Sequence, residues 1–314
     1  MMTKFFIKIT LFSIFPIVSL YGILLLDNGR TDPFYRRFTT PKQSALILGN
    51  SKAAQGIVPE VLNSELEDVF NTKIYNYSFT VYNSPYGPVY LESIKRKLKD
   101  GIKGSYFIVT VDPWSISSYK EAPNDTALFD ENHQFLKDIE KVDLNPNWYY
   151  IKDHYRKSFY EIPLQWIKPG YSKLHQDGWF ETTGEMKDVA ITKRRKFMVN
   201  FYEGYLKKYS FSQTRFNYLK QTISFLSKYG KVFLVRMPLH PDILNIEEKV
   251  IYDFDFKMKQ LSKEKNIPYK DFNNISDVYV FKDGLHLDPE SGKNLSVEIS
   301  KWIRKENRHN LNDY

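Results

Sequence analysis

The chain has 314 residues, no cysteine and a formal net charge of +8, with 42% hydrophobic and 26% charged residues. This length and composition suit a globular protein with a sizeable core, and the lack of cysteine excludes disulfides and thiolate metal sites. The positive charge favours anionic partners such as phospholipid headgroups. The sequence has no zinc-finger spacing, Walker loop or glycine-rich dinucleotide fingerprint, so we expect neither a nucleic-acid partner nor a cofactor.

The first segment predicts a membrane anchor over residues 1–26. Residues 9–26 carry no charge, and this run is about the minimum length for a membrane span. The end of the run lacks the small residues of a signal-peptide cleavage site, which favours an uncleaved single-pass anchor over a cleaved signal. Lys4 and Lys8 precede the run, although basic residues also follow it. We expect the domain on the exported, periplasmic or extracellular side of the cytoplasmic membrane.

Residues 27–43 are polar and predict a linker, and strands then alternate with helices through a domain placed at 44–314. Short apolar runs predict five strands, at 44–50, 73–79, 105–113, 231–238 and 268–272. Helical patterns predict five helices, at 59–70, 84–100, 212–230, 245–266 and 288–307. For three of these helices the sequence also predicts the capping residue, namely Ser84, Asn245 and Asp288.

The alternation stops at about 114–205, which we interpret as an insertion. Within it, residues 148–180 contain ten aromatic residues, three of them tryptophan. Aromatic faces can stack on sugar rings, but packing as a cap over the sheet is the favoured interpretation. The basic run 193–196 is interpreted as a solvated surface, with contact to anionic lipid as the alternative.

The alternation predicts a three-layer α/β/α fold with a parallel five-stranded sheet, as in flavodoxin-like proteins, where sites form at the carboxyl ends of strands. Ser51 directly follows the first strand. A serine hydroxyl needs a base to become a nucleophile, and His286, between the fifth strand and the last helix, would lie at the same edge. Asp283 can reach that imidazole, fix its tautomer and stabilise the imidazolium.

Plainer interpretations of these residues remain open. A serine after a strand is often only a turn or cap residue, and the segment around His286 could be a turn leading into a capped helix. Asp283, His286 and Asp288 could also bind a metal ion, but no second cluster supports this and we predict no metal site. Arg236, near the end of the fourth strand, and His240, just after it, are candidate cleft residues, and Arg236 could equally be the partner of a carboxylate.

Two short blocks carry a resemblance to a known family. The GNS motif at 49–51 resembles the first block of the SGNH, or GDSL-like, hydrolase superfamily, with Asn50 where many members have Asp. The DGLH motif at 283–286 resembles the last block of that superfamily. The resemblance covers roughly residues 44–113 and 231–307. The anchor and the GIVPEVL segment after the serine look closest to the membrane-anchored, polysaccharide-modifying branch, which includes the D-alanyl transfer protein of teichoic acid modification and the alginate acetylation proteins.

The resemblance implies that Ser51 is the nucleophile, His286 the general base and Asp283 the orienting acid. It implies a serine esterase or O-acyltransferase that acts on cell-envelope glycan esters through an acyl-Ser51 intermediate. The partners implied are the lipid bilayer, the glycan and a polytopic membrane-bound O-acyltransferase. The alternative is a non-catalytic envelope assembly or glycan-binding protein on a degenerate SGNH fold.

The oxyanion-binding groups are less well matched, which is the feature in favour of that alternative. The second block of the superfamily supplies a glycine N–H, whereas the matching loop here offers Thr80, Asn83 and Ser84 as candidates. The third block, Gly-x-Asn-Asp, is absent, and Asp112 falls nearest to it. A carboxylate would repel an oxyanion, so the backbone N–H of Ser51 is the donor that the sequence supplies in any case.

Overall fold

The computed structural model describes residues 2–312, so the expected domain limit at residue 314 lies just outside the described part. Five parallel strands form the central sheet, in the order β2–β1–β3–β8–β9. They are β1 Ala45–Leu48, β2 Ile74–Asn76, β3 Ser105–Thr110, β8 Gly230–Arg236 and β9 Tyr269–Asp271. Each coincides with a predicted strand to within a few residues, and the predicted α/β class is confirmed. Because β2 lies on one side of β1 and β3 on the other, the strand order reverses between β1 and β3.

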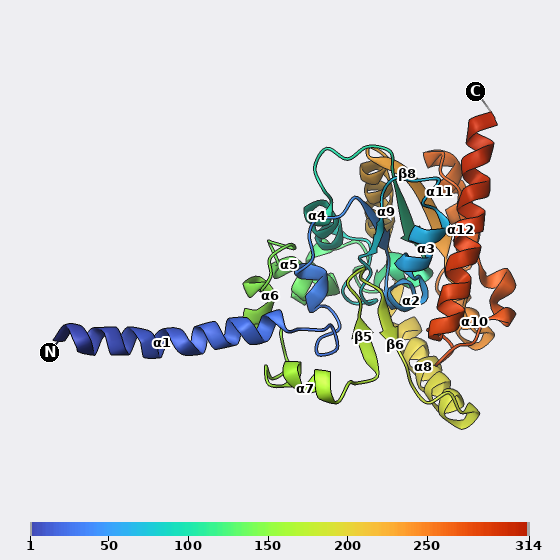
Figure 1. Cartoon of the computed structure of the whole chain (residues 1–314). Helices are drawn as coiled ribbons and strands as arrows, with labels where there is room; N and C mark the ends of the chain where they lie inside the picture. Colours follow the sequence, from blue (N-terminus) through green and yellow to red (C-terminus); the bar gives the residue numbers. More distant parts are fainter. Residues whose placement is uncertain (1, 313–314) are drawn as a thin grey trace.

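Both faces of the sheet are buried, which explains why its strands are apolar runs. Leu46 and Leu48 pack into one core cluster, and Ala45 and Ile47 into another, because side chains alternate along a strand. The first cluster is covered by α4 Pro88–Lys97, α9 Gln213–Leu226 and α11 Phe254–Lys265. The second is covered by α2 Ser51–Gly56, α3 Pro59–Glu65 and α12 Pro289–Asn312 (Figure 1). The layers are therefore helix, sheet and helix.

Helix starts were predicted with mixed success. The cap at Asp288 is confirmed, because its carboxylate accepts the N–H of Ser291 at 2.8 Å. The cap at Ser84 is wrong: α4 begins later, and the Ser84 hydroxyl donates to the carbonyl of Gly49 at 2.7 Å instead. The short helix α2 was not predicted.

The helix predicted at 245–266 is wrong as a single element. It is two helices, α10 Pro241–Val250 and α11, separated by residues 251–253. Asn245 lies inside α10, and His240 is the residue that caps it. Pro241 favours this earlier start, because the first helical position needs no N–H donor.

The insertion is a set of short elements ended by one long helix. Before that helix come η2 Pro113–Ile116, β4 Ser117–Tyr119, η3 Thr126–Leu128, η4 Asp130–His133, α5 Phe135–Asp138, α6 Trp148–Asp153, α7 Glu161–Ile167, β5 Ser172–Leu174 and β6 Phe180–Thr182. The long helix is α8, Asp188–Lys208, and β7 Tyr209–Phe211 follows it and pairs antiparallel with β4. Sequence periodicity missed α8 because only Tyr202 and Tyr205 of its side chains are buried.

Residues 27–43, which we expected to be a linker, are packed into the domain. Tyr35 and Phe38, within the short helix η1 Tyr35–Phe38, belong to the core. Arg37 is 1% exposed, and its guanidinium donates to three backbone carbonyls. The ammonium of Lys97 donates to the carbonyls of Arg37, at 2.8 Å, and Thr40, at 2.6 Å. Carbonyl oxygens thus accept the hydrogen bonds of these two buried basic groups, which lets a polar-looking segment fold against the core.

The N-terminal helix α1, Met2–Leu25, extends away from the domain and is exposed along most of its length (Figure 1). It is long and apolar enough to cross a membrane or to be a signal sequence. Only its last turn meets the domain, where Leu24 is buried. The helix itself is therefore as predicted, and its place in a membrane stays a prediction.

Candidate active site

The turn after β1 places Ser51 at the point where the strand order reverses. Gly49 leaves the strand with φ +150°, and a Cβ added there would lie 1.8 Å from the Thr110 hydroxyl of β3. Asn50 then caps α2 by accepting the N–H of Lys52 at 3.1 Å. Ser51 is the first residue of that helix, directly above the carboxyl ends of β1 and β3.

We expect Gly49→Ala to destabilise the protein clearly more than Gly101→Ala does. Both glycines have positive φ, but nothing lies within 4 Å of a Cβ at Gly101. The shared backbone strain costs about 1 kcal/mol, and the clash with Thr110 adds about 1–3 kcal/mol. Thermal unfolding of the full chain in detergent micelles, followed by circular dichroism, measures the difference. Equal losses would mean that the close approach of β1 to β3 does not require glycine.

A tight turn before α12 holds the other two residues of the predicted triad. One carboxylate oxygen of Asp283 accepts the N–H groups of Leu285, at 2.9 Å, and His286, at 2.8 Å. Gly284 supplies the positive φ of +85° that this turn needs. The turn therefore fixes the carboxyl group and leaves its second oxygen free to meet the imidazole.

Ser51, His286 and Asp283 form one hydrogen-bonded chain. The Nδ1 atom of His286 lies 2.7 Å from the Asp283 carboxylate, and its Nε2 atom lies 2.9 Å from the Ser51 hydroxyl. A carboxylate can only accept, so Nδ1 carries the proton and Nε2 accepts from the serine. Burial alone would raise the pKa of Asp283, but its contacts with His286 and the two backbone N–H groups lower that pKa to about 2. Asp283 is therefore ionised at neutral pH.

The candidate oxyanion residues are held by neighbours. Asn50 donates to Asp112 at 2.6 Å, and Thr80 donates to the side-chain oxygen of Asn83 at 2.6 Å. Asn83 donates in turn to a glutamine oxygen at 3.0 Å, and the hydroxyl of Ser84 is committed to Gly49. These residues shape the loop beside Ser51. The N–H of Ser51 remains the donor best placed by position, because the first N–H groups of a helix have no acceptor within it.

A buried charge network, which was not predicted from the sequence, begins at the residue after Ser51. The ammonium of Lys52 is 4% exposed and contacts Glu247 at 2.5 Å and Asp112 at 3.1 Å. Arg236 continues the network, 3.5 Å from Glu247 and 3.1 Å from Asp271. Burial lowers the pKa of Lys52, but the charges of Asp112 and Glu247 outweigh it and keep the amine charged. Arg236 is thus a partner of carboxylates rather than a cleft residue, and the Asp112 charge is paired.

The insertion reaches the site through α8. Arg194 donates to the carbonyl of Lys282, next to Asp283, at 2.8 Å. Arg195 lies 2.7 Å from the Nε2 atom of His240, whose backbone N–H donates to the carbonyl of Gly284 at 3.0 Å. Burial, and then the Arg195 charge, lowers the pKa of His240. The basic run at 193–196 is therefore divided between solvent and contacts that hold the turn containing Asp283 and His286.

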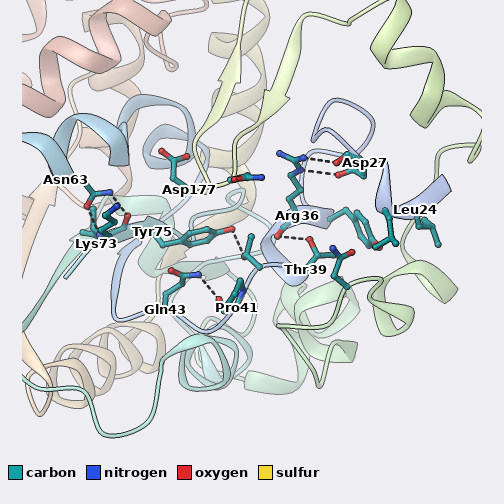
Figure 2. A pocket seen from close by; sticks show the side chains of 16 residues that line it. Leu24, Asp27, Arg36, Thr39, Pro41, Gln43, Asn63, Lys73, Tyr75 and Asp177 are labelled. Carbon is teal, nitrogen blue, oxygen red and sulfur yellow. Dashed lines mark hydrogen bonds and ion pairs between the residues drawn. The ribbon is translucent and has the colours of Figure 1, made fainter. Parts of the chain in front are cut away.

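Two of the cavities in the described residues lie close to the loop beside Ser51 and to the base of α1. One, of about 550 Å³, is lined by Thr80 and Asn83 of the loop beside Ser51 and by residues of the insertion. The other, of about 560 Å³, lies at the base of α1, between Leu24, Arg36 and Tyr75 (Figure 2). Among the residues that the structure describes, no group of three or more His, Asp or Glu side chains could hold a metal ion.

Comparison with known proteins gives distant structural matches only. The chain is similar to Est24, a carbohydrate acetylesterase from Sinorhizobium meliloti, with 12% identity and a TM-score of 0.40 over 84% of this chain and 99% of that chain. It is also similar to the inhibitor-bound form of the M. smegmatis aryl esterase, with 11% identity and a TM-score of 0.37 over 83% of this chain and 98% of that chain. No protein-family model and no curated protein matches the sequence. At this distance the function has to be argued from the site itself.

Proposed function

We propose that the chain is a serine esterase or O-acyltransferase that works through an acyl-Ser51 intermediate. The observation that carries the proposal is the hydrogen-bonded chain from Ser51 through His286 to Asp283, at the point where strand order reverses. Sites of open parallel sheets form at that point. A nucleophile within reach of a base, with the base oriented by a third group, is the arrangement that acyl transfer requires.

The reaction follows from these contacts. His286 accepts the proton of Ser51 at Nε2 while the serine oxygen attacks the acyl carbon of an ester, and Asp283 stabilises the imidazolium that forms. The tetrahedral adduct collapses, the bond to the leaving alcohol breaks, and the alcohol oxygen takes the proton from His286. Water or a second hydroxyl then loses its proton to His286 and attacks the acyl-serine. The bond between the acyl carbon and the Ser51 oxygen breaks, and His286 returns the proton to that oxygen. Water gives hydrolysis, and a second hydroxyl gives transfer.

Paired charges around the nucleophile support this chemistry. The carboxylate of Asp112 would oppose a developing oxyanion if its charge were free, but Lys52 and Asn50 both contact it. The Ser51 N–H at the start of α2 is positioned to donate to that oxyanion. For the substrate we propose an acyl ester of a cell-envelope glycan, because the N-terminal anchor and the GIVPEVL segment after Ser51 resemble the polysaccharide-modifying branch of the superfamily.

A fluorophosphonate probe tests the proposal, because it reacts with serines that a neighbouring base activates. We expect peptide mass spectrometry of the full chain in detergent micelles to find the label on Ser51. The matched control is the Ser78→Ala variant, which lacks a buried serine in the loop after β2. This variant should be labelled at Ser51 as the wild type is. A folded chain without label at Ser51 would contradict the proposal and favour the non-catalytic, glycan-binding alternative.

The labelling rate should fall towards acid pH with the slope of a single proton. Protonated His286 cannot accept the Ser51 proton, so its protonation stops the reaction. The pKa of Asp283 is lowered to about 2, so this carboxylate stays ionised at pH values well above 2. Rates measured from pH 3 to 8, wherever circular dichroism reports a folded chain, check this. A slope of two protons would mean that Asp283 titrates with the imidazole.

A further inference from the structure

The end of α1 is fixed to the domain by several contacts. Leu24 is 1% exposed, and the carboxylate of Asp27 forms an ion pair with Arg36 at 3.3 Å. Arg36 also donates to the carbonyl of Asp27 at 2.7 Å, and both contacts are visible in Figure 2. From the insertion, the indole N–H of Trp166 donates to the carbonyl of Leu26 at 2.8 Å. The direction of α1 therefore also sets the orientation of the domain.

Exposed aromatic and aliphatic side chains gather around the point where α1 leaves the domain. They belong to α6, to α7 and the residue that precedes it, and to the segment before β5, and they are Trp148, Tyr149, Tyr160, Leu164, Trp166, Ile167 and Tyr171. We call this set the juxtamembrane face. In Figure 1, α6 and α7 lie on opposite sides of the base of α1. Trp166 is 64% exposed and Ile167 is 83% exposed, so ordinary packing does not explain this part of the insertion.

The position of Trp166 along the membrane normal follows from helix geometry. The uncharged run at 9–26 spans about 27 Å as a helix, close to the roughly 30 Å thickness of a hydrocarbon core. If this run crosses the bilayer, Leu26 lies at the edge of the core, and so does the indole bonded to it. Tryptophan and tyrosine are enriched at that level, because their rings are apolar and their N–H or O–H groups stay hydrated.

The charges around this face also favour a lipid bilayer as its partner. Residues 148–174 contain five basic residues, Lys152, Arg156, Lys157, Lys168 and Lys173, against two acidic ones, Asp153 and Glu161. Basic groups next to a membrane helix are attracted by anionic lipid headgroups. An apolar surface bordered by cations, held at the interfacial level of α1, fits a lipid surface.

We propose that the juxtamembrane face is a membrane-binding surface, which lies among the headgroups of a bilayer containing anionic lipid. The domain then has two membrane contacts, the α1 span and this face. The proposal is independent of the catalytic role of Ser51.

Nitroxide labels test the proposal in the full chain, which has no native cysteine to interfere. Single substitutions Ile167→Cys and Tyr171→Cys place labels on the face. Tyr252→Cys is the matched control: this side chain is 92% exposed and lies between α10 and α11, on the side of the domain away from α1 (Figure 1), and Phe12→Cys reports the bilayer core. The chain is reconstituted in vesicles of phosphatidylcholine with about one third phosphatidylglycerol. The measurement is the ratio of collision rates with oxygen, which partitions into lipid, and with a water-soluble nickel complex.

We expect the two labels on the face to show a ratio several-fold above that of the Tyr252 control and below that at Phe12. Ratios at 167 and 171 equal to the control, with Phe12 in lipid, would overturn the proposal and point to a protein partner for the face. A water-like ratio at Phe12 would also overturn it, because the anchor itself would then lie outside the bilayer. In phosphatidylcholine alone the ratios at the face should fall, and unchanged ratios would overturn the requirement for anionic lipid.

Discussion

Asp283→Asn is expected to lower the turnover of p-nitrophenyl acetate by roughly 10⁴-fold while leaving the fold intact. The carboxylate lies 2.7 Å from Nδ1 of His286, so that Nδ1 carries the proton. An amide nitrogen at that position donates instead, which moves the imidazole proton to Nε2. His286 then presents a donor to Ser51 and cannot accept its proton. Hydrolysis by the purified full chain in detergent micelles measures the loss, with Ser51→Ala as the baseline.

Asp288→Asn is the matched control for this variant. Asp288 lies five residues further along the chain and caps α12 by accepting the N–H of Ser291. Asparagine caps helices about as well as aspartate, so this variant should keep nearly full activity. Activity of Asp283→Asn within tenfold of the wild type would show that the tautomer of His286 is fixed by some other group.

Lys52→Met is expected to cost about 3–5 kcal/mol of folding free energy, a fall of on the order of 10 °C in melting temperature. Its ammonium contacts two buried carboxylates, those of Asp112 and Glu247. Removing the cation leaves the two carboxylates close together in the core, where solvent cannot screen them and where Arg236 and Asn50 compensate them in part. Thermal unfolding of the full chain in detergent micelles, followed by circular dichroism, gives the shift.

Two further variants test whether the stability loss in Lys52→Met comes from the buried charge network. Lys42 pairs with Asp100 at the surface, so Lys42→Met should change stability by less than about 1 kcal/mol. Adding Glu247→Gln to Lys52→Met removes one of the stranded charges and should recover part of the lost stability. If Lys52→Met and Lys42→Met had the same melting temperature, the buried network would not contribute to stability as argued.

The sheet and the triad could be predicted because their signals are local. Each strand is a short apolar run, and each half of the site lies next to a sequence feature that ends an element. Ser51 lies just after the end of β1, and His286 lies in a turn marked by Asp283 and Gly284. The rule that parallel strands place sites at one edge then brings residues 235 positions apart to within 2.9 Å.

What could not be predicted depends on contacts between distant residues. Lys52 and Glu247 are 195 positions apart, and neither has a neighbour in the sequence that marks it as buried. Arg37 looks like part of a polar linker because its acceptors are backbone carbonyls, which no side-chain pattern reveals. Helix α8 has few buried side chains and therefore weak periodicity, so its contact through Arg194 and Arg195 with the turn before α12 could not be predicted.

The contacts that fix α1 to the domain affect how an enzyme of the proposed kind would reach its substrate. A catalytic domain on a flexible tether samples a hemisphere whose radius grows with tether length. Here Arg36, Arg37 and Lys97 fold the connecting residues against the core and leave no tether. With α1 in a bilayer, Ser51 would stay at one height above the lipid, and the protein could search only by diffusing sideways within the membrane. If the substrate is the proposed cell-envelope glycan, such an enzyme would modify only the glycan chains that lie at the height of Ser51 above the membrane. It would not modify chains that lie nearer to the membrane or farther from it.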